Sequence, residues 1–204
     1  MPMTRTVALL TVVTVVAACA RKESASDSAR IADSVAAATN MAPPPATTPP
    51  AEAAAALTDP NIIFILHQAN ASDSARGRLA ESKGTSADVK SFGKLMVGEH
   101  HTLRAAGEVL AKKQNLTPQA PAADQSEMQA KQEMDSLTAL AKGAAWDKAY
   151  IAYEVGYHQA LMDIANKALA TTQNPEMKAL ITKAAPVVQK HLDRAKEIQA
   201  KQGA

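Results

Sequence analysis

Apolar and polar residues follow a helical period through most of the chain. From Thr58 onward, apolar side chains recur at steps of three and four residues, which is the spacing of one face of an α-helix. The stripe formed by Val89, Phe92, Met96 and Leu103 shows this most plainly. Helices are therefore predicted over about residues 59–83, 86–114, 124–140, 146–169 and 175–198.

Residues that start or stop helices mark the predicted boundaries. Asp59-Pro60 and Asn174-Pro175 each place a capping side chain before a proline at the first helical position. Gly84 ends the first helix, and Asp124 with Glu127 has the spacing of a capping box for the third, short helix. Four long helices, each with an apolar stripe, pack most economically as an up-down four-helix bundle with one extra short helix. We therefore expect an all-α fold.

The first residues have the pattern of a secretory signal. Arg5 precedes an apolar run over residues 7–18, which is shorter than the roughly 20 residues that a membrane-spanning helix needs. The run ends in Val16-Ala17-Ala18-Cys19, which resembles a bacterial lipoprotein box, in which the Cys receives lipid and becomes the first mature residue. An ordinary signal peptide with an incidental Cys is the alternative. We expect a lipoprotein signal peptide over residues 1–18 and lipidation at Cys19.

Residues 19–57 are expected to form a disordered tether that starts at the lipidated Cys19. The segment is rich in Ala, Ser, Thr and Pro, and residues 20–57 contain no aromatic side chain. Such a composition cannot bury enough apolar surface to offset the conformational entropy lost on folding. The bundle domain then covers residues 58–204, and the lipid is its only expected contact with a membrane. By resemblance to enterobacterial sorting, Ala20 after the Cys favours an outer-membrane anchor facing the periplasm.

Composition narrows the class of function. With 22 basic and 20 acidic residues, the net charge of +2 gives no electrostatic reason to expect a nucleic-acid partner. The single Cys excludes an internal disulfide, a cysteine-based zinc site and an iron–sulfur cluster. Neither a glycine-rich phosphate loop nor a nucleophile elbow occurs, so the sequence gives no support for an enzyme and no catalytic residue is assigned.

Histidines interrupt three of the apolar stripes. His100, His158 and His191 each stand where the periodicity calls for a buried apolar residue, and Asp73 takes such a position in the first helix. Each lies near the middle of its helix, so a bundle would bring all four into one central layer whichever way the helices run. Glu154 lies four residues before His158 and therefore shares its face.

A layer of buried polar groups needs partners, because an unpaired polar group costs several kcal/mol. One hypothesis is a single transition-metal ion, namely zinc, copper, iron or nickel, held by the three histidines with Asp73 and Glu154. The alternative is a hydrogen-bonded layer without an ion. Glu99 is expected to lean in only from the side, and His67 and His101 to lie off the central face.

Three segments of the chain resemble the motifs of a known family. They are Phe92 with Met96-Val97 and Glu99-His100, residues 143–150 followed by His158-Gln159, and Pro186 with His191 and Ala195. Across about residues 59–200 the chain resembles the predicted outer membrane protein family, domain of unknown function 4142. The resemblance implies a ferritin-like helical bundle in an exported bacterial protein, with no established activity.

Two hypotheses of function follow. The first is a periplasm-facing lipoprotein that binds a transition metal through Asp73, His100, His158, His191 and Glu154 and buffers or senses it. The second is a non-catalytic structural or interaction module of the cell envelope with a metal-free polar layer and an unidentified protein partner. A di-iron centre is not expected, because ferritin-like di-iron proteins use Glu-x-x-His and neither His158 nor His191 has a Glu three residues before it.

Overall fold

Four long helices and one short helix make up the described part of the chain. The structure is a computed structural model that describes residues 57–203. The predicted signal peptide, Cys19 and the tether before residue 57 lie outside the described residues. The helices are α2 (Asp59–Lys83), α3 (Ala87–Lys113), α4 (Ser126–Ala139), α5 (Ala144–Thr171) and α6 (Pro175–Gly203). Residues 57–203 contain no strand, so the predicted all-α bundle is confirmed.

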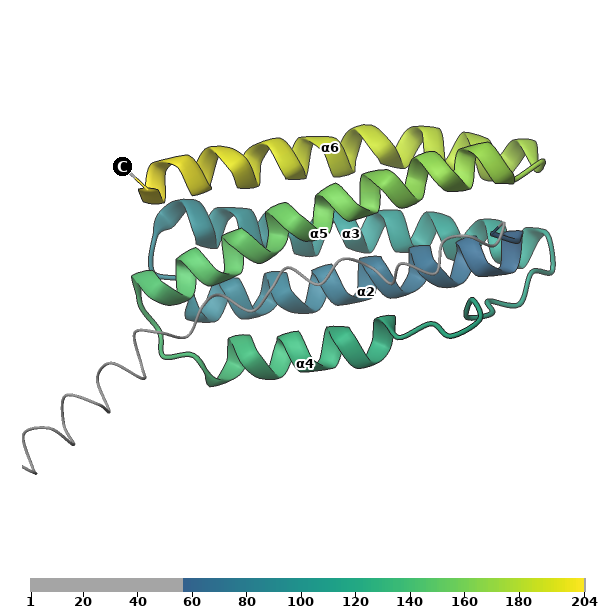
Figure 1. Cartoon of the computed structure of the whole chain (residues 1–204). Helices are drawn as coiled ribbons and strands as arrows, with labels where there is room; N and C mark the ends of the chain where they lie inside the picture. The colour runs from purple at the N-terminus through teal and green to yellow at the C-terminus, as the bar shows by residue number, and fades with distance from the viewer. Residues whose placement is uncertain (1–56, 204) are drawn as a thin grey trace, which may run out of the picture. The chain divides into compact units, whose positions relative to one another are not determined.

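The long helices form two hairpins that pack against each other. α2 pairs with α3 and α5 pairs with α6, while α3 contacts α6 and α2 contacts α5. α4 lies beside α2 and α5 and carries the chain back along the bundle, so that α3 and α5 run in the same direction (Figure 1). The bundle therefore contains one long crossover connection between its two hairpins. Among the described residues, no helix combines the length and the apolarity needed to cross a membrane.

Side-chain caps begin three of the helices close to the predicted positions. Thr58 and Asn61 form a reciprocal capping box at the start of α2. The Ser86 hydroxyl accepts a hydrogen bond from the Val89 backbone at the start of α3, at 3.1 Å. Asn174 Oδ1 accepts hydrogen bonds from the backbone amides of Glu176 and Met177 at the start of α6.

The predicted start of the short helix at Asp124 is wrong by two residues. Ala123 has a φ of 53°, so the chain turns immediately before Asp124 instead of entering a helix. The Asp124 carboxylate accepts hydrogen bonds from the backbone amide and the hydroxyl of Ser126, where α4 begins. Asp124 therefore lies outside the helix and accepts hydrogen bonds from the first residue of α4.

Two side chains, Asp147 and Lys83, fix the α2–α3 turn against the other elements. Asp147, in the first turn of α5, accepts hydrogen bonds from the backbone amides of Thr85 and Ser86 at 2.9 and 2.8 Å. Lys83 donates to the carbonyl oxygens of Leu137 and Leu140 at the end of α4. These contacts satisfy backbone groups that helix termini leave without partners, and they set how far each helix extends along the bundle.

The apolar core is divided into two clusters by the central polar residues. The first cluster contains Ala80, Val89, Phe92, Met96, Leu137, Trp146, Tyr150, Ile151, Ala195 and Ile198. The second contains Ile62, Ile63, Leu110, Ala111, Ala168, Met177 and Ile181. In each of the four long helices, buried polar residues lie between the two clusters: one each in α3 and α6, two in α5 and four in α2. The polar residues therefore lie between two apolar clusters.

Two glycines let α2 and α3 approach closely beside this layer. A Cβ atom on Gly77 would lie 2.6 Å from the Gly93 carbonyl oxygen, and one on Gly93 would lie 2.7 Å from the Gly77 carbonyl oxygen. Because the obstacle in each case is backbone, it cannot rotate away. Glycine is therefore required at both positions for the observed spacing of the two helices.

We expect Gly93→Ala to lower the free energy of unfolding by about 1–3 kcal/mol, because the added methyl overpacks the contact between α2 and α3. Gly98→Ala on the same helix is the matched control, since its added Cβ meets no atom within 4 Å. That change should be neutral or stabilising by up to about 1 kcal/mol, because alanine favours helix. Urea denaturation followed by circular dichroism measures both variants. Equal effects would contradict the close approach.

Candidate metal centre

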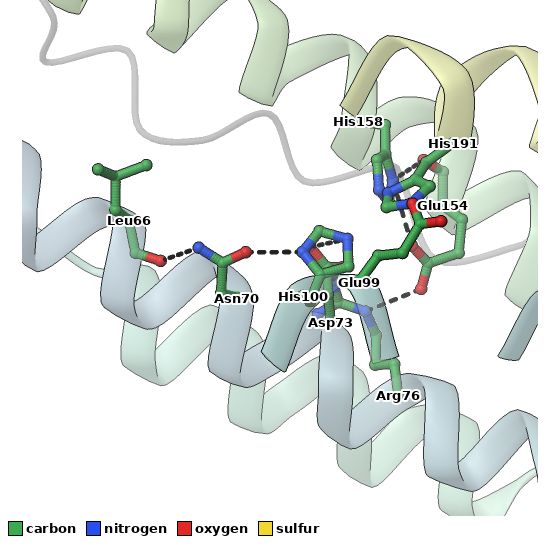
Figure 2. Close-up of polar contacts among 9 residues, drawn as sticks. All are labelled: Leu66, Asn70, Asp73, Arg76, Glu99, His100, Glu154, His158 and His191. Carbon is green, nitrogen blue, oxygen red and sulfur yellow. Dashed lines mark hydrogen bonds and ion pairs between the residues drawn. The ribbon is translucent and has the colours of Figure 1, made fainter. Parts of the chain in front are cut away.

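The structure brings all five predicted site residues together in the middle of the bundle. Asp73 comes from α2, His100 from α3, Glu154 and His158 from α5, and His191 from α6, and each side chain is at most 1% exposed. The ring centroid of His100 lies 4.8 Å from that of His191 and 5.6 Å from that of His158. Figure 2 shows the three rings gathered between the helices. One ligand atom from each ring lies within 4.8 Å of the others.

His100 is oriented by an amide on α2. Its Nδ1 lies 2.8 Å from Oδ1 of Asn70, whose own amide nitrogen donates to the carbonyl of Leu66 at 2.6 Å (Figure 2). The amide oxygen of Asn70 can only accept, so Nδ1 of His100 carries the proton. The lone pair of the neutral ring is therefore on Nε2, which has no hydrogen-bond partner.

His158 is oriented by its own helix. Nδ1 lies 2.9 Å from the backbone carbonyl oxygen of Glu154 and 3.3 Å from its Oε2. Both oxygens are acceptors, so Nδ1 donates, and the remaining nitrogen, Nε2, is buried without a partner. The spacing of four residues that placed Glu154 and His158 on one face is also what allows this contact.

His191 is oriented through Nε2, whereas His100 and His158 are oriented through Nδ1. Its Nε2 lies 2.8 Å from Oε2 of Glu99, and Lys190 donates to the other carboxylate oxygen at 2.9 Å. Burial raises the pKa of Glu99, but the hydrogen bonds from Lys190 and His191 outweigh this and lower the pKa overall. Glu99 is therefore an ionised acceptor, and Nδ1 of His191 is left without a partner. The sequence placed Glu99 at the side of the layer, where it lies 31% exposed.

The three rings thus share one arrangement. Each donates one N–H outward, to an amide oxygen, a backbone carbonyl or a carboxylate, and each has its other nitrogen buried without a partner. Histidines that bind metals are commonly held in this way, because the outer hydrogen bond fixes both the tautomer and the ring orientation. The arrangement can therefore present three nitrogen lone pairs to one cation.

Arg76 is the cation of this layer, and it is not among the residues predicted from the sequence. Its side chain is 1% exposed; Nη2 pairs with Oδ1 of Asp73, and Nε lies 3.1 Å from Oε1 of Glu154. Arg76 lies three residues after Asp73 and four before Ala80, so the inward-facing spacing was visible in the sequence. Arginine is almost never fully buried unless it is paired, so its spacing alone does not indicate that it lies in the core.

Arg76 is also enclosed by two aromatic side chains. Its guanidinium carbon lies 4.5 Å from the ring centroid of Tyr153 and 4.3 Å from that of Tyr157. The two rings stack on each other with centroids 5.5 Å apart, and both line a cleft between α2, α4 and α5. The tyrosines therefore separate the guanidinium from that cleft and add cation–π stabilisation. We call Asp73, Arg76, His100, Glu154, His158 and His191 the polar layer.

Burial and neighbouring charges give the three histidines different pKa values. Burial lowers the pKa of His100 well below 6.5, and the proximity of His158 and His191 adds to this. Burial and His158 likewise lower the pKa of His191. For His158, burial lowers the pKa, but Asp73 and the contacts with Glu154 outweigh burial and raise it overall. His100 and His191 are thus neutral bases, and His158 is the ring that holds a proton most strongly.

Two carboxylate oxygens complete the set of unpaired atoms. Oδ2 of Asp73 and Oε2 of Glu154 are buried and have no hydrogen-bond partner. Oδ2 of Asp73 lies 3.5 Å from Nε2 of His100. Asp73, Glu154 and His158 form a second group whose ligand atoms lie within 4.8 Å of one another. The layer therefore offers both nitrogen and oxygen ligands.

The remaining histidines lie away from the layer, as the sequence predicted. His67 is exposed and its Nδ1 lies 3.5 Å from Glu108 on α3. His101 is exposed on the same helix as His100. Both residues are therefore suitable controls for substitutions of the buried rings.

Comparisons with known proteins give a family and no activity. The sequence model of a family described as "Domain of unknown function (DUF4142)" matches residues 44–198. No curated protein and no solved structure matches the chain. The match agrees with the family resemblance of the sequence motifs, while the ferritin-like likeness stays a prediction.

The geometry predicts the tautomers of two rings in the metal-free protein. At neutral pH, His100 should carry its proton on Nδ1 and His191 should carry its proton on Nε2, because Asn70 and Glu99 accept from those atoms. Acidification through pH 6.5 should leave His100 neutral, since burial lowers its pKa. Long-range nitrogen–proton NMR of the rings measures both properties. A His100 ring protonated on Nε2, or charged near pH 6.5, would contradict this site geometry.

Proposed function

The chain belongs to the DUF4142 family, and from its own buried site we propose that the protein binds a divalent transition-metal ion through His100, His158 and His191. Asp73 or Glu154 supplies an oxygen ligand.

We propose further that the domain is held in the cell envelope, anchored by lipid at Cys19 in the outer membrane and facing the periplasm. There the protein would buffer or sense the metal.

The unpaired nitrogens carry the proposal. Three imidazole nitrogens and two carboxylate oxygens are buried without hydrogen-bond partners at the same level of the bundle. Each unsatisfied buried group costs about 1–3 kcal/mol. A single cation would satisfy several of these atoms at once, and the outward hydrogen bonds already hold the three rings in the orientation that ligation requires.

The chemistry of the ligands narrows the choice of ion. Imidazole nitrogen suits zinc, copper, iron and nickel, whereas calcium and magnesium prefer sites built from oxygen. Three histidines with one carboxylate give the four ligands that zinc takes. Zn²⁺ is therefore the first probe, with Cu²⁺, Ni²⁺ and Fe²⁺ as comparisons.

A metal-free layer is the competing function, and one observation favours it. Arg76 already pairs with both carboxylates, and a protonated His158 would balance the remaining negative charge. Such a layer would fix the register of the helices in a structural or interaction module. It leaves the inward nitrogens of His100 and His191 unexplained, which is why we prefer the metal.

The proposed anchor is tested at Cys19. When the full chain is expressed in a bacterial host with labelled fatty acid, the wild-type protein should incorporate label and sediment with membranes. Cys19→Ala should lose the label, because the lipid is attached to the thiol. Gel autoradiography after membrane fractionation measures both. Label that persists in the variant, or no label in the wild type, would refute lipidation.

The proposed metal site is tested by removing one ligand. Purified, chelator-treated protein should bind Zn²⁺, and free ion at 100 times its dissociation constant should add about 2.7 kcal/mol of stability. For a domain of this size, that corresponds to a rise in melting temperature of roughly 5–10 °C. His100→Ala should abolish the rise. Calorimetry and elemental analysis measure both quantities.

The matched control is His101→Ala, which removes an exposed imidazole from the neighbouring position of α3. It should keep the wild-type response to Zn²⁺. Glu99→Gln, which keeps the shape but weakens the acceptor for His191, should lower metal affinity by about 10–100-fold. Wild-type protein that retains none of the four ions and shows no thermal shift would leave the metal-free layer as the function.

A further inference from the structure

The polar layer contains two groups of metal-ligand atoms that share one residue. One group is His100, His158 and His191, and the other is Asp73, Glu154 and His158. Two neighbouring groups of ligands are the arrangement of a two-metal centre, in which the ions lie about 3.5–4 Å apart. Because Nδ1 of His158 donates to the backbone carbonyl of Glu154, His158 can bind only one ion, and the second ion would be held by the carboxylates of Asp73 and Glu154. The second group, however, already has a cation beside it, because Arg76 pairs with both of its carboxylates.

We propose that the Arg76 guanidinium takes the place of a second metal ion, so that the centre binds one divalent ion at the three histidines. This inference rests on the proposed function and determines the number of ions that the site accepts. It assigns Arg76 a role in metal stoichiometry that neither the family match nor the sequence motifs indicate.

Charge is the first argument for one ion. The carboxylates of Asp73 and Glu154 carry two negative charges, and Arg76 cancels one of them. A divalent ion at the histidines then exceeds the remaining negative charge of these three groups. A second divalent ion would lie next to both a guanidinium and the first ion. At such separations in a buried site the repulsion amounts to several kcal/mol.

The division of the carboxylate oxygens is the second argument. Arg76 takes Oδ1 of Asp73 and Oε1 of Glu154, whereas Oδ2 and Oε2 have no hydrogen-bond partner and face His100 and His158 at 3.5 and 3.3 Å. Each carboxylate is therefore held by one oxygen and leaves the other for the histidine side. Arg76 both blocks the second position and orients the oxygen ligand of the first.

The guanidinium is held firmly in this position. Two carboxylates and the faces of Tyr153 and Tyr157 surround it, and its side chain is 1% exposed. Burial lowers the pKa of Arg76, but Asp73 and Glu154 outweigh burial and raise it well above the ordinary value. The group thus keeps its charge and cannot leave without breaking two ion pairs and two aromatic contacts.

The test compares the number of Zn²⁺ ions bound to full-length wild-type protein and to Arg76→Met. After chelator treatment, reloading with excess Zn²⁺ and desalting, elemental analysis should find about one ion per wild-type chain and about two per variant chain. Arg76→Lys keeps the charge and is the matched control, with about one ion expected. Two ions in the wild type, or one in Arg76→Met, would overturn the proposal.

Spin coupling provides a second measurement on the wild type. With two equivalents of Cu²⁺, electron paramagnetic resonance should show an isolated ion, because no second ion lies close enough to couple. A coupled pair in the wild type would overturn the proposal. Arg76→Met should show coupling. If that variant folds only when Zn²⁺ is added, recovery of helical circular dichroism with two bound ions supports the proposal, and failure to recover overturns it.

The outcomes separate this inference from the proposed function. A wild type that binds no ion would defeat the proposed metal site itself. A wild type that binds one ion, together with an Arg76→Met variant that also binds one, would leave the metal site standing and remove only the role assigned to Arg76.

Discussion

The polar layer is the constraint on which the rest of the bundle depends. Six side chains that carry charges or imidazoles lie fully buried between two apolar clusters. Each of the four long helices must therefore place its members of the layer at the same height along the bundle. A shift of one helix by a single turn, about 5.4 Å, would place an imidazole or a carboxylate against apolar side chains. The caps at Thr58, Ser86 and Asn174 and the contacts of Lys83 and Asp147 fix the helix ends and therefore keep that level.

The periodicity of the sequence was sufficient for the helices and for most of the layer. Apolar steps of three and four residues predicted five helices, and the histidines stood out because they interrupt those stripes. Counting along each helix then placed His100, His158, His191 and Asp73 at one height, which needs only the rise per residue. The start of α4 could not be found in this way, because it depends on the backbone turn at Ala123.

The contacts of Arg76 and the outward hydrogen-bond partners of the histidines could be identified only from the structure. A charged residue at a stripe position is ordinarily a solvated edge, and only the position of α5 shows that Glu154 meets Arg76 from another helix. The roles of Asn70 and Glu99 could not be predicted for the same reason, because each role depends on which nitrogen of a histidine ring the side chain contacts. Sequence spacing gives the face and the height of a side chain, but not the rotamer or the proton position that decides whether a nitrogen can bind a metal.

The direction in which the histidine N–H groups donate distinguishes a metal site from a structural layer. In a layer stabilised only by hydrogen bonds, the inward nitrogens of the three histidines would be expected to pair with one another or with Asp73 and Glu154. Here each ring donates away from the other two, and His100 and His191 have pKa values lowered by burial. When all three rings are neutral, their three lone pairs lie in a position where none can satisfy another, which is unfavourable unless a cation is shared among them. Arg76 supplies positive charge only to the carboxylate side, so it relieves Asp73 and Glu154 but leaves the nitrogens unpaired. An arginine and a metal ion are thus complementary in this bundle, and each satisfies the atoms that the other does not reach.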